Sequence, residues 1–107
     1  MELRIYGVIL EAIGMLRTEI EVIGRRDPDL QNQLRRAAAS MALNCSEGSG
    51  SRGRNAQVRF HTALGSARET LACVEVAVAF GYLPALRAEL NQHMQHIIGT
   101  LTKLARS

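Results

Sequence analysis

The stretch FHTALGSARETLACVEVAV, residues 60–78, decides the fold that we predict for this 107-residue chain. Apolar residues recur in it every three or four positions, which places them along one side of an α-helix. The members of this stripe are Phe60, Leu64, Ala67, Leu71, Val74 and Val78. The pattern predicts a helix over about residues 54–80, with Gly81 at its end because glycine commonly terminates helices.

The same spacing continues on both sides of this stretch. It predicts further helices over about residues 3–23, 28–47 and 84–105. Asp27 and Pro28 form a start signal for the second helix, and we expect Gly48 to end it. Short connections between long helices make neighbouring helices antiparallel. We therefore expect an all-α fold, an antiparallel up-down-up-down four-helix bundle that forms a single domain over residues 1–107.

The first predicted helix is apolar on more than one side. Its buried stripe is expected to consist of Tyr6, Ile9, Ile13, Leu16, Ile20 and Ile23. Five further apolar residues fall outside that stripe: Leu3, Ile5, Val8, Leu10 and Val22. A second apolar face on a small bundle usually needs cover from another subunit, so we expect a homo-oligomer.

The composition narrows the class of protein. Apolar residues make up 47% of the chain, which is typical of a packed globular domain. No apolar run approaches the roughly 18 residues of a membrane span, and the N-terminus lacks the pattern of a signal peptide. Cys45 and Cys73 belong to no C-x-x-C pair and are expected to be free thiols. These features predict a cytoplasmic protein with no membrane contact.

Positive charge is concentrated in the middle of the chain. The net charge is +3, yet residues 34–68 carry six arginines against one acid, Glu47. Within this region EGSGSRG, residues 47–53, has the G-x-G-x-x-G spacing of a dinucleotide-binding loop. That motif has meaning only between a strand and a helix, and here it follows a helix. We therefore interpret it as a glycine-rich turn between two helices.

This turn carries the arginines that we consider candidates for nucleic-acid contact. Arg52 and Arg54 lie in it and Arg59 follows one or two helical turns later, an arrangement suited to phosphate or an acidic surface. A solvated basic loop without a ligand fits the same residues equally well. Arg35 is a further candidate, although its position about 13 residues before Gly48 puts it nearly 20 Å away along the helix.

Polar residues interrupt the stripe of the second helix. Asn44 falls on the stripe, and Glu47 follows three residues later on the same face. A buried asparagine must satisfy its amide, and in bundles it commonly fixes helix register. We expect Asn44, Glu47 and Ser66 to be structural, with a ligand site as the alternative for the first two. Level positions across the hairpin also predict an ion pair between Arg36 and Glu69.

The histidines raise the question of a metal site. Glu89, His93 and His96 share one face of the last helix, whereas His61 lies on another helix. A di-iron bundle needs two Glu-x-x-His motifs, and the chain has neither. No spacing supports a Ser/His/Asp or Cys/His arrangement. We therefore expect no metal, no cofactor and no catalytic residue, and thus no enzyme.

Three motifs resemble those of a known bacterial family. They are LRRAAASMALNCSEGSGSR at residues 34–52, ALGSARE at 63–69 and FGYL at 80–83. They resemble the four-helix bundle proteins that are encoded in intervening sequences of 23S ribosomal RNA genes. The matching positions are Gln33, Arg35, Arg36, Ala37, Ser40, Asn44, Glu47, Gly48, Ala63, Gly65, Ser66, Glu69, Gly81, Tyr82 and Leu83. The chain departs from the family pattern at Ala42, where relatives have proline, and at Cys45 and Ser46, where they have Ile-Ala.

The resemblance implies a bundle that assembles into a ring-like homopentamer. It also implies kinship with the accessory protein of diversity-generating retroelements, which is pentameric and basic and binds nucleic acid and a reverse transcriptase. No catalytic activity is implied for the ribosomal branch. The leading hypothesis is a non-catalytic homo-oligomer that binds nucleic acid, RNA in particular, through basic turns, with a ribonucleoprotein or reverse transcriptase as a further partner. The alternative hypothesis is a protein-interaction scaffold without nucleic-acid contact.

Overall fold

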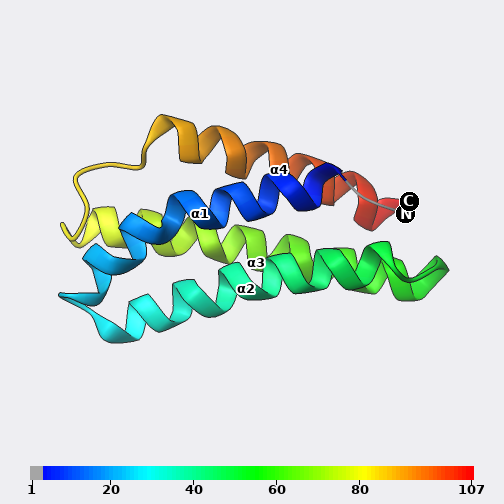
Figure 1. Cartoon of the computed structure of the whole chain (residues 1–107), viewed down its shortest axis with the longest axis horizontal. Helices are drawn as coiled ribbons and strands as arrows, with labels where there is room; N and C mark the ends of the chain where they lie inside the picture. Colours follow the sequence, from blue (N-terminus) through cyan, green and yellow to red (C-terminus); the bar gives the residue numbers. More distant parts are fainter. Residues whose placement is uncertain (1–3) are drawn as a thin grey trace.

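The computed structural model describes residues 4–107 and confirms the predicted fold (Figure 1). Its four helices are α1 (Arg4–Gly24), α2 (Pro28–Ser49), α3 (Gly53–Ala79) and α4 (Ala88–Arg106). They alternate in direction and form a bundle of 42 × 24 × 19 Å (Figure 1). The most extensive packing is between α2 and α3, and α1 lies between α2 and α4.

This topology brings distant segments together at each end of the bundle. The α2–α3 turn lies at the same end as the start of α1 and the end of α4 (Figure 1). We call this end, residues 4–10, 47–59 and 100–107, the basic end. The α1–α2 turn and the α3–α4 connection lie at the opposite end. We call that end, residues 15–31 and 80–87, the closed end.

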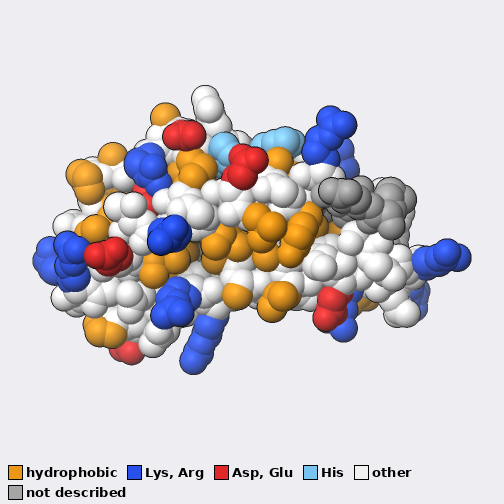
Figure 2. Space-filling view, in the orientation of Figure 1, with side chains coloured by type: hydrophobic (Ala, Val, Ile, Leu, Met, Phe, Trp, Pro, Cys, Tyr) orange, Lys and Arg blue, Asp and Glu red, His pale blue; other side chains and the backbone are white. Residues whose placement is uncertain are grey.

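The buried stripe of α1 differs from the predicted one. It consists of Ile5, Ile9, Ala12, Leu16, Glu19 and Ile23. Tyr6, Ile13 and Ile20, which were expected in it, are half-buried at its border. The reason is that α1 is apolar over a wide arc, so the positions of its two neighbours decide which side is fully covered. Figure 2 shows apolar side chains in a band along the face on which α1 lies.

The predicted second apolar face of α1 is largely covered within the chain. Ile5 is buried in the core, and Val8 and Val22 pack against it as half-buried residues. Leu10 stays exposed, whereas Leu3 falls outside the described residues. These residues therefore give little support to the argument for an oligomer that they motivated.

The stripes of α2 and α3 follow the prediction closely, but Gly48 has a different role. α2 continues to Ser49 and is capped by Gly50, whose φ of −92° is ordinary for any residue. Gly48 itself is buried, and a Cβ at this position would lie 2.7 Å from the ring of Phe60. Close packing against that ring, and not helix termination, requires the glycine.

The last helix begins later than predicted, at Ala88 instead of residue 84. The preceding connection turns at Gly81, whose φ of 81° favours glycine, and then buries Leu83 in the core. Leu86, which the apolar pattern assigned to the helix, is half-buried in the connection. These two leucines hold the connection against the bundle, so the helix starts after them.

Internal polar contacts tie the closed end together. Arg87 donates from Nε and Nη2 to the two carboxylate oxygens of Glu19, at 2.7 and 3.0 Å, and from Nη2 to the carbonyl of Met15 at 2.6 Å. The Glu19 side chain is 5% exposed. Asp27 accepts from the backbone N–H of Leu30 at 3.0 Å, which confirms the predicted helix start, and from the Tyr82 hydroxyl at 3.1 Å.

Two further observations concern the chain as a whole. Cys45 and Cys73 are both free and buried. Burial raises the pKa of both thiols, and the nearby Glu69 carboxylate raises that of Cys73 further. Over residues 4–107, no helix combines the length and the apolarity that a membrane crossing needs.

Candidate functional site

Arg52 in the α2–α3 turn and Arg54 in the first turn of α3 are presented to solvent at the corner of the bundle. Arg52 precedes α3 with an extended backbone, and its side chain makes no capping hydrogen bond. Gly53 follows with a φ of 58°, a conformation that glycine adopts without strain. Both arginines are exposed, and neither forms an ion pair within the described part of the chain. Their charges are therefore available to an external group.

Arg59 is placed differently from these two arginines. Its Nε lies 3.0 Å from Oε2 of Glu47, and its Nη1 donates to Oδ1 of Asn44 at 3.4 Å. The side chains of Arg59 and Glu47 are 50% and 58% exposed, so water weakens the pair without removing it. The ion pair partly neutralises Arg59, which makes it a weaker phosphate contact than the sequence predicted.

A chain of polar contacts links α2 to α3 behind this ion pair. The Asn44 amide donates to the carbonyl and the hydroxyl of Ser40 at 3.0 and 3.1 Å. The Ser40 hydroxyl in turn lies 2.7 Å from that of Ser66. Asn44, Glu47 and Ser66 thus belong to one network with Ser40 and Arg59, two members that the sequence did not assign to it. The network aligns the two helices because two of its contacts, Arg59 with Glu47 and Ser40 with Ser66, join α3 to α2.

The predicted ion pair between Arg36 and Glu69 does not form in the described chain, so that prediction was wrong. The contact of Ser40 with Ser66 puts Arg36 and Glu69 at similar levels along the two helices. The side chains of Arg36 and Glu69 are nevertheless both exposed. Exposed partners gain little from pairing because water solvates each charge as well. Arg35 is also exposed, on the middle of α2, and does not belong to the basic end.

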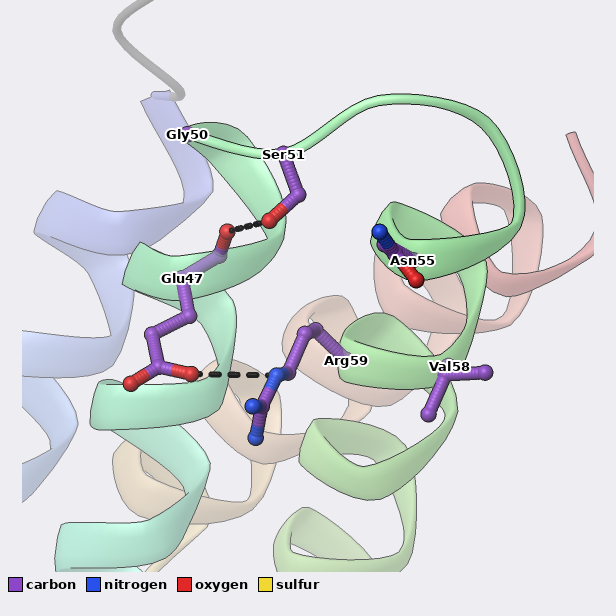
Figure 3. A pocket seen from close by; sticks show the side chains of 6 residues that line it. All are labelled: Glu47, Gly50, Ser51, Asn55, Val58 and Arg59. Carbon is purple, nitrogen blue, oxygen red and sulfur yellow. Dashed lines mark hydrogen bonds and ion pairs between the residues drawn. The ribbon is translucent and has the colours of Figure 1, made fainter.

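An open hollow lies between α2 and α3 beside the turn (Figure 3). Its lining consists of Glu47, Gly50, Ser51, Asn55, Val58 and Arg59. Figure 3 shows the ion pair of Glu47 and Arg59 crossing from one helix to the other below the turn. The Ser51 hydroxyl donates to the carbonyl of Glu47 at 2.8 Å, which fixes the start of the turn over the hollow.

The end of α4 brings two more cations to this region. The Gln57 side chain donates to the carbonyl of Ser107. Leu104 of α4 lines a second hollow together with Arg52. The last turn of α4, to which Leu104 belongs, also contains Lys103 and Arg106. Lys103 and Arg106 were not predicted as part of the site, although an antiparallel topology already places the end of the fourth helix beside the second turn.

The basic end therefore has a strong excess of positive charge. Its three segments contain six cationic side chains, Arg4, Arg52, Arg54, Arg59, Lys103 and Arg106, against one acidic side chain, Glu47. Figure 2 shows Lys and Arg side chains projecting from this end. The arrangement suits contacts with several phosphates at once.

The histidine face of α4 makes contacts within the bundle. His93 is held between the carboxylate of Glu11, 3.2 Å from Nε2, and the carbonyl of Glu89, 3.1 Å from Nδ1. The hydrogen bond with Glu11 is the main cause of the raised pKa of His93. Across residues 4–107, no three His, Cys, Asp or Glu side chains come close enough to hold a metal ion together.

Comparisons with known proteins agree with this architecture. A crystal structure of a protein of unknown function from the S23 ribosomal protein family of Bacteroides thetaiotaomicron is similar in fold, with a TM-score of 0.79 over 96% of this chain and 99% of that one. The two chains are 17% identical, so the likeness concerns the fold alone. No curated protein matches the chain. Residues 15–103 match the family model of the 23S rRNA-intervening sequence protein. The chain therefore belongs to the family of 23S rRNA-intervening sequence proteins.

Proposed function

We propose that this chain is a non-catalytic, self-associating bundle of the cytoplasm that binds RNA through its basic end. The observation that carries the proposal is that three segments with six cationic side chains, Arg52 and Arg54 among them, meet at one end of the bundle. Arginine and lysine bind phosphate, and release of counterions from the nucleic acid supplies the free energy. Such contacts position a strand without reading its sequence.

The candidate arginines contribute unequally in this proposal. Arg52 and Arg54 are the main phosphate contacts because both are exposed and unpaired in the described chain. Arg59 adds less because Glu47 lies 3.0 Å from its Nε. Arg35 contacts only a strand long enough to run down α2, since about 13 residues of helix, nearly 20 Å, separate it from Gly48.

Self-association would repeat the basic end and raise the affinity for a long RNA. The support is a set of exposed apolar side chains distributed along the α2–α3 hairpin. Leu43 and Phe80 are each 63% exposed, and Val76 is 41% exposed. A ring-like homopentamer, as the family resemblance implies, is the assembly that we propose. Sedimentation as a monomer at micromolar concentration would contradict it.

The test of RNA binding is the affinity for a single-stranded RNA at several salt concentrations. We compare the wild type with the double variant Arg52→Ala/Arg54→Ala. A matched control, Arg17→Ala/Arg25→Ala, removes two exposed arginines away from the basic end and changes the net charge equally. Each phosphate contact contributes a slope of about 0.7 to the salt dependence, so the first variant should flatten it by about 1.4 and the control should leave it unchanged. An affinity that is insensitive to salt, or equal effects of both variants, would contradict the proposal.

A protein-interaction scaffold is the second candidate function, and the exposed apolar side chains of the hairpin favour it. In that case the basic end meets an acidic protein, for example a component of a ribonucleoprotein or a reverse transcriptase. Capture of partners from cells with and without nuclease treatment separates the two functions. Partners that are all retained after nuclease favour the scaffold, and partners that are lost with the RNA favour RNA binding.

A further inference from the structure

The hollow beside the α2–α3 turn has a floor whose position is fixed by the chain itself. The guanidinium of Arg59 is held by the Glu47 carboxylate at 3.0 Å (Figure 3) and by the side-chain amide oxygen of Asn44 at 3.4 Å. Asn44 is anchored in turn to Ser40. A planar guanidinium held in this way is a surface on which a flat ring can stack.

The walls of the hollow offer both polar and apolar contacts. Asn55 lies one turn before Arg59, and no hydrogen bond joins its amide to the other lining residues (Figure 3). Val58 is 55% exposed and supplies an apolar edge. Arg59 occupies one lone pair of Glu47 Oε2, which leaves Oε1 and the second lone pair of Oε2 as acceptors. The top is formed by Gly50, where no side chain narrows the opening.

The position of the hollow relates it to phosphate binding. Arg52 directly follows Ser51 and Arg54 directly precedes Asn55, and both of these neighbours line the hollow. A strand whose phosphates meet these two arginines has its bases within reach of the hollow, provided that the bases are unpaired. A duplex does not fit, because its bases are stacked and their edges are paired.

We propose that this hollow binds one unpaired guanine base of a single-stranded RNA or an RNA loop. Guanine presents N1–H and the N2 amino group side by side, and this pair of donors matches the Glu47 carboxylate. Asn55 supplies an amide to the same base, and the ring lies over Arg59 and against Val58. The inference rests on the proposed function, since Arg52 and Arg54 hold the phosphates that bring the base to the hollow. It adds a preference for one base to a contact that is otherwise independent of sequence.

The experiment uses three RNA 12-mers with the whole 107-residue chain. The first strand is uridine with one central guanosine, the second has an abasic site there, and the third is uridine throughout. Because the hollow is open, we expect the hydrogen bonds to the base edge to give a modest preference, about tenfold for guanosine over both other strands. Asn55→Ala should reduce this preference to less than about threefold, with the salt dependence unchanged. The matched control is Asn32→Ala, which changes an exposed asparagine of α2 far from the hollow and should keep the full preference.

Each outcome decides the question. Equal, salt-dependent affinities of the wild type for all three strands would overturn the guanine site and leave the proposed function intact. No binding to any strand would overturn both. A preference for guanosine that persists in Asn55→Ala would place the base elsewhere and overturn this site. A preference for guanosine and uridine alike over the abasic strand would show that the hollow does not select guanine, which also overturns the proposal.

Discussion

At the closed end, the carboxylates of Glu19 and Asp27 are each bound by another part of the chain, whereas at the basic end Arg52 and Arg54 face solvent. The two ends are built from similar helices and turns. They differ in whether the charges have partners within the bundle. Charges that are paired and buried hold the chain together, and charges that stay exposed are available for binding.

The stability of the closed end depends on its charged residues because one of them, Glu19, lies in the core. Glu19 occupies a position in the buried stripe of α1, and a buried carboxylate is costly unless it is paired. Arg87 meets both of its oxygens and also reaches the carbonyl of Met15. At the basic end, the ion pair between Glu47 and Arg59 is half-exposed and contributes little to stability.

The largest effect is expected at the closed end. Arg87→Met leaves Glu19 buried without a partner and should lower the free energy of unfolding by about 3 kcal/mol, measured by urea denaturation. The control Arg25→Met breaks the exposed pair with Glu21 and should cost no more than about 0.5 kcal/mol. Equal losses in the two variants would show that burial of Glu19 does not distinguish this end.

The stability of the basic end should depend on packing more than on charge. Gly48→Ala puts a methyl group against the Phe60 ring and should cost about 2 kcal/mol in the same measurement. Phe60→Leu added to it should restore part of the loss, because the shorter side chain vacates space. As a control, Gly14→Ala has no atoms within 4 Å of the new methyl and should stabilise the helix by about 0.5 kcal/mol. A stable Gly48→Ala variant would show that the two helices can move apart there.

The third prediction changes a charge at the basic end that is partly paired. Glu47→Gln removes the anion that holds Arg59 and frees its guanidinium for phosphate. The salt dependence of RNA binding should steepen by about 0.7, while stability changes by less than about 1 kcal/mol. Preference for guanosine should fall at the same time. A flatter salt dependence would mean that Arg59 does not contact RNA even when it is free.

The smallest effect is expected between the two ends, where His93 of α4 meets Glu11 of α1. Because the folded state raises the pKa of His93, protonation stabilises the fold. This contribution is complete below the ordinary histidine pKa of about 6.5 and is lost as the pH rises through the folded value above it. His93→Gln should therefore cost up to about 1 kcal/mol at pH 5.5 and less at pH 8.5, as unfolding curves at both values will show. A larger cost at the higher pH would reverse this reasoning.

Much of the fold was predictable because the apolar residues of α2 and α3 that recur every three or four positions form a narrow stripe on each helix. Where only one side of a helix is apolar, one side faces the core, and Leu34, Met41 and Leu64 are buried as expected. The spacing failed for α1, whose apolar arc is too wide to specify one stripe. It also gave no sign that Glu19 is buried, because the partner that permits this lies 68 residues away at Arg87.

The candidate site was predictable in part for a similar reason. Arg52 and Arg54 follow a glycine-rich segment, so their place in an exposed turn could be expected from local sequence. The pairing of Arg59 with Glu47 depends on the register between α2 and α3, which the local sequence does not fix. The prediction of an Arg36–Glu69 pair was wrong because register alone does not hold two exposed side chains together.

The sequence by itself determined four helices, their approximate limits, the glycine-rich turn and the family, because periodicity and local motifs act over a few residues. The tertiary structure decided which cations share one end of the bundle, which acidic side chain is buried and how Arg59 is held at the floor of a hollow. These outcomes depend on the directions and the register of packed helices. The physical reason is that a charge is stabilised or left exposed by its neighbours in space, and α4 supplies neighbours to the α2–α3 turn from about 50 residues away, as the contact of Gln57 with Ser107 shows.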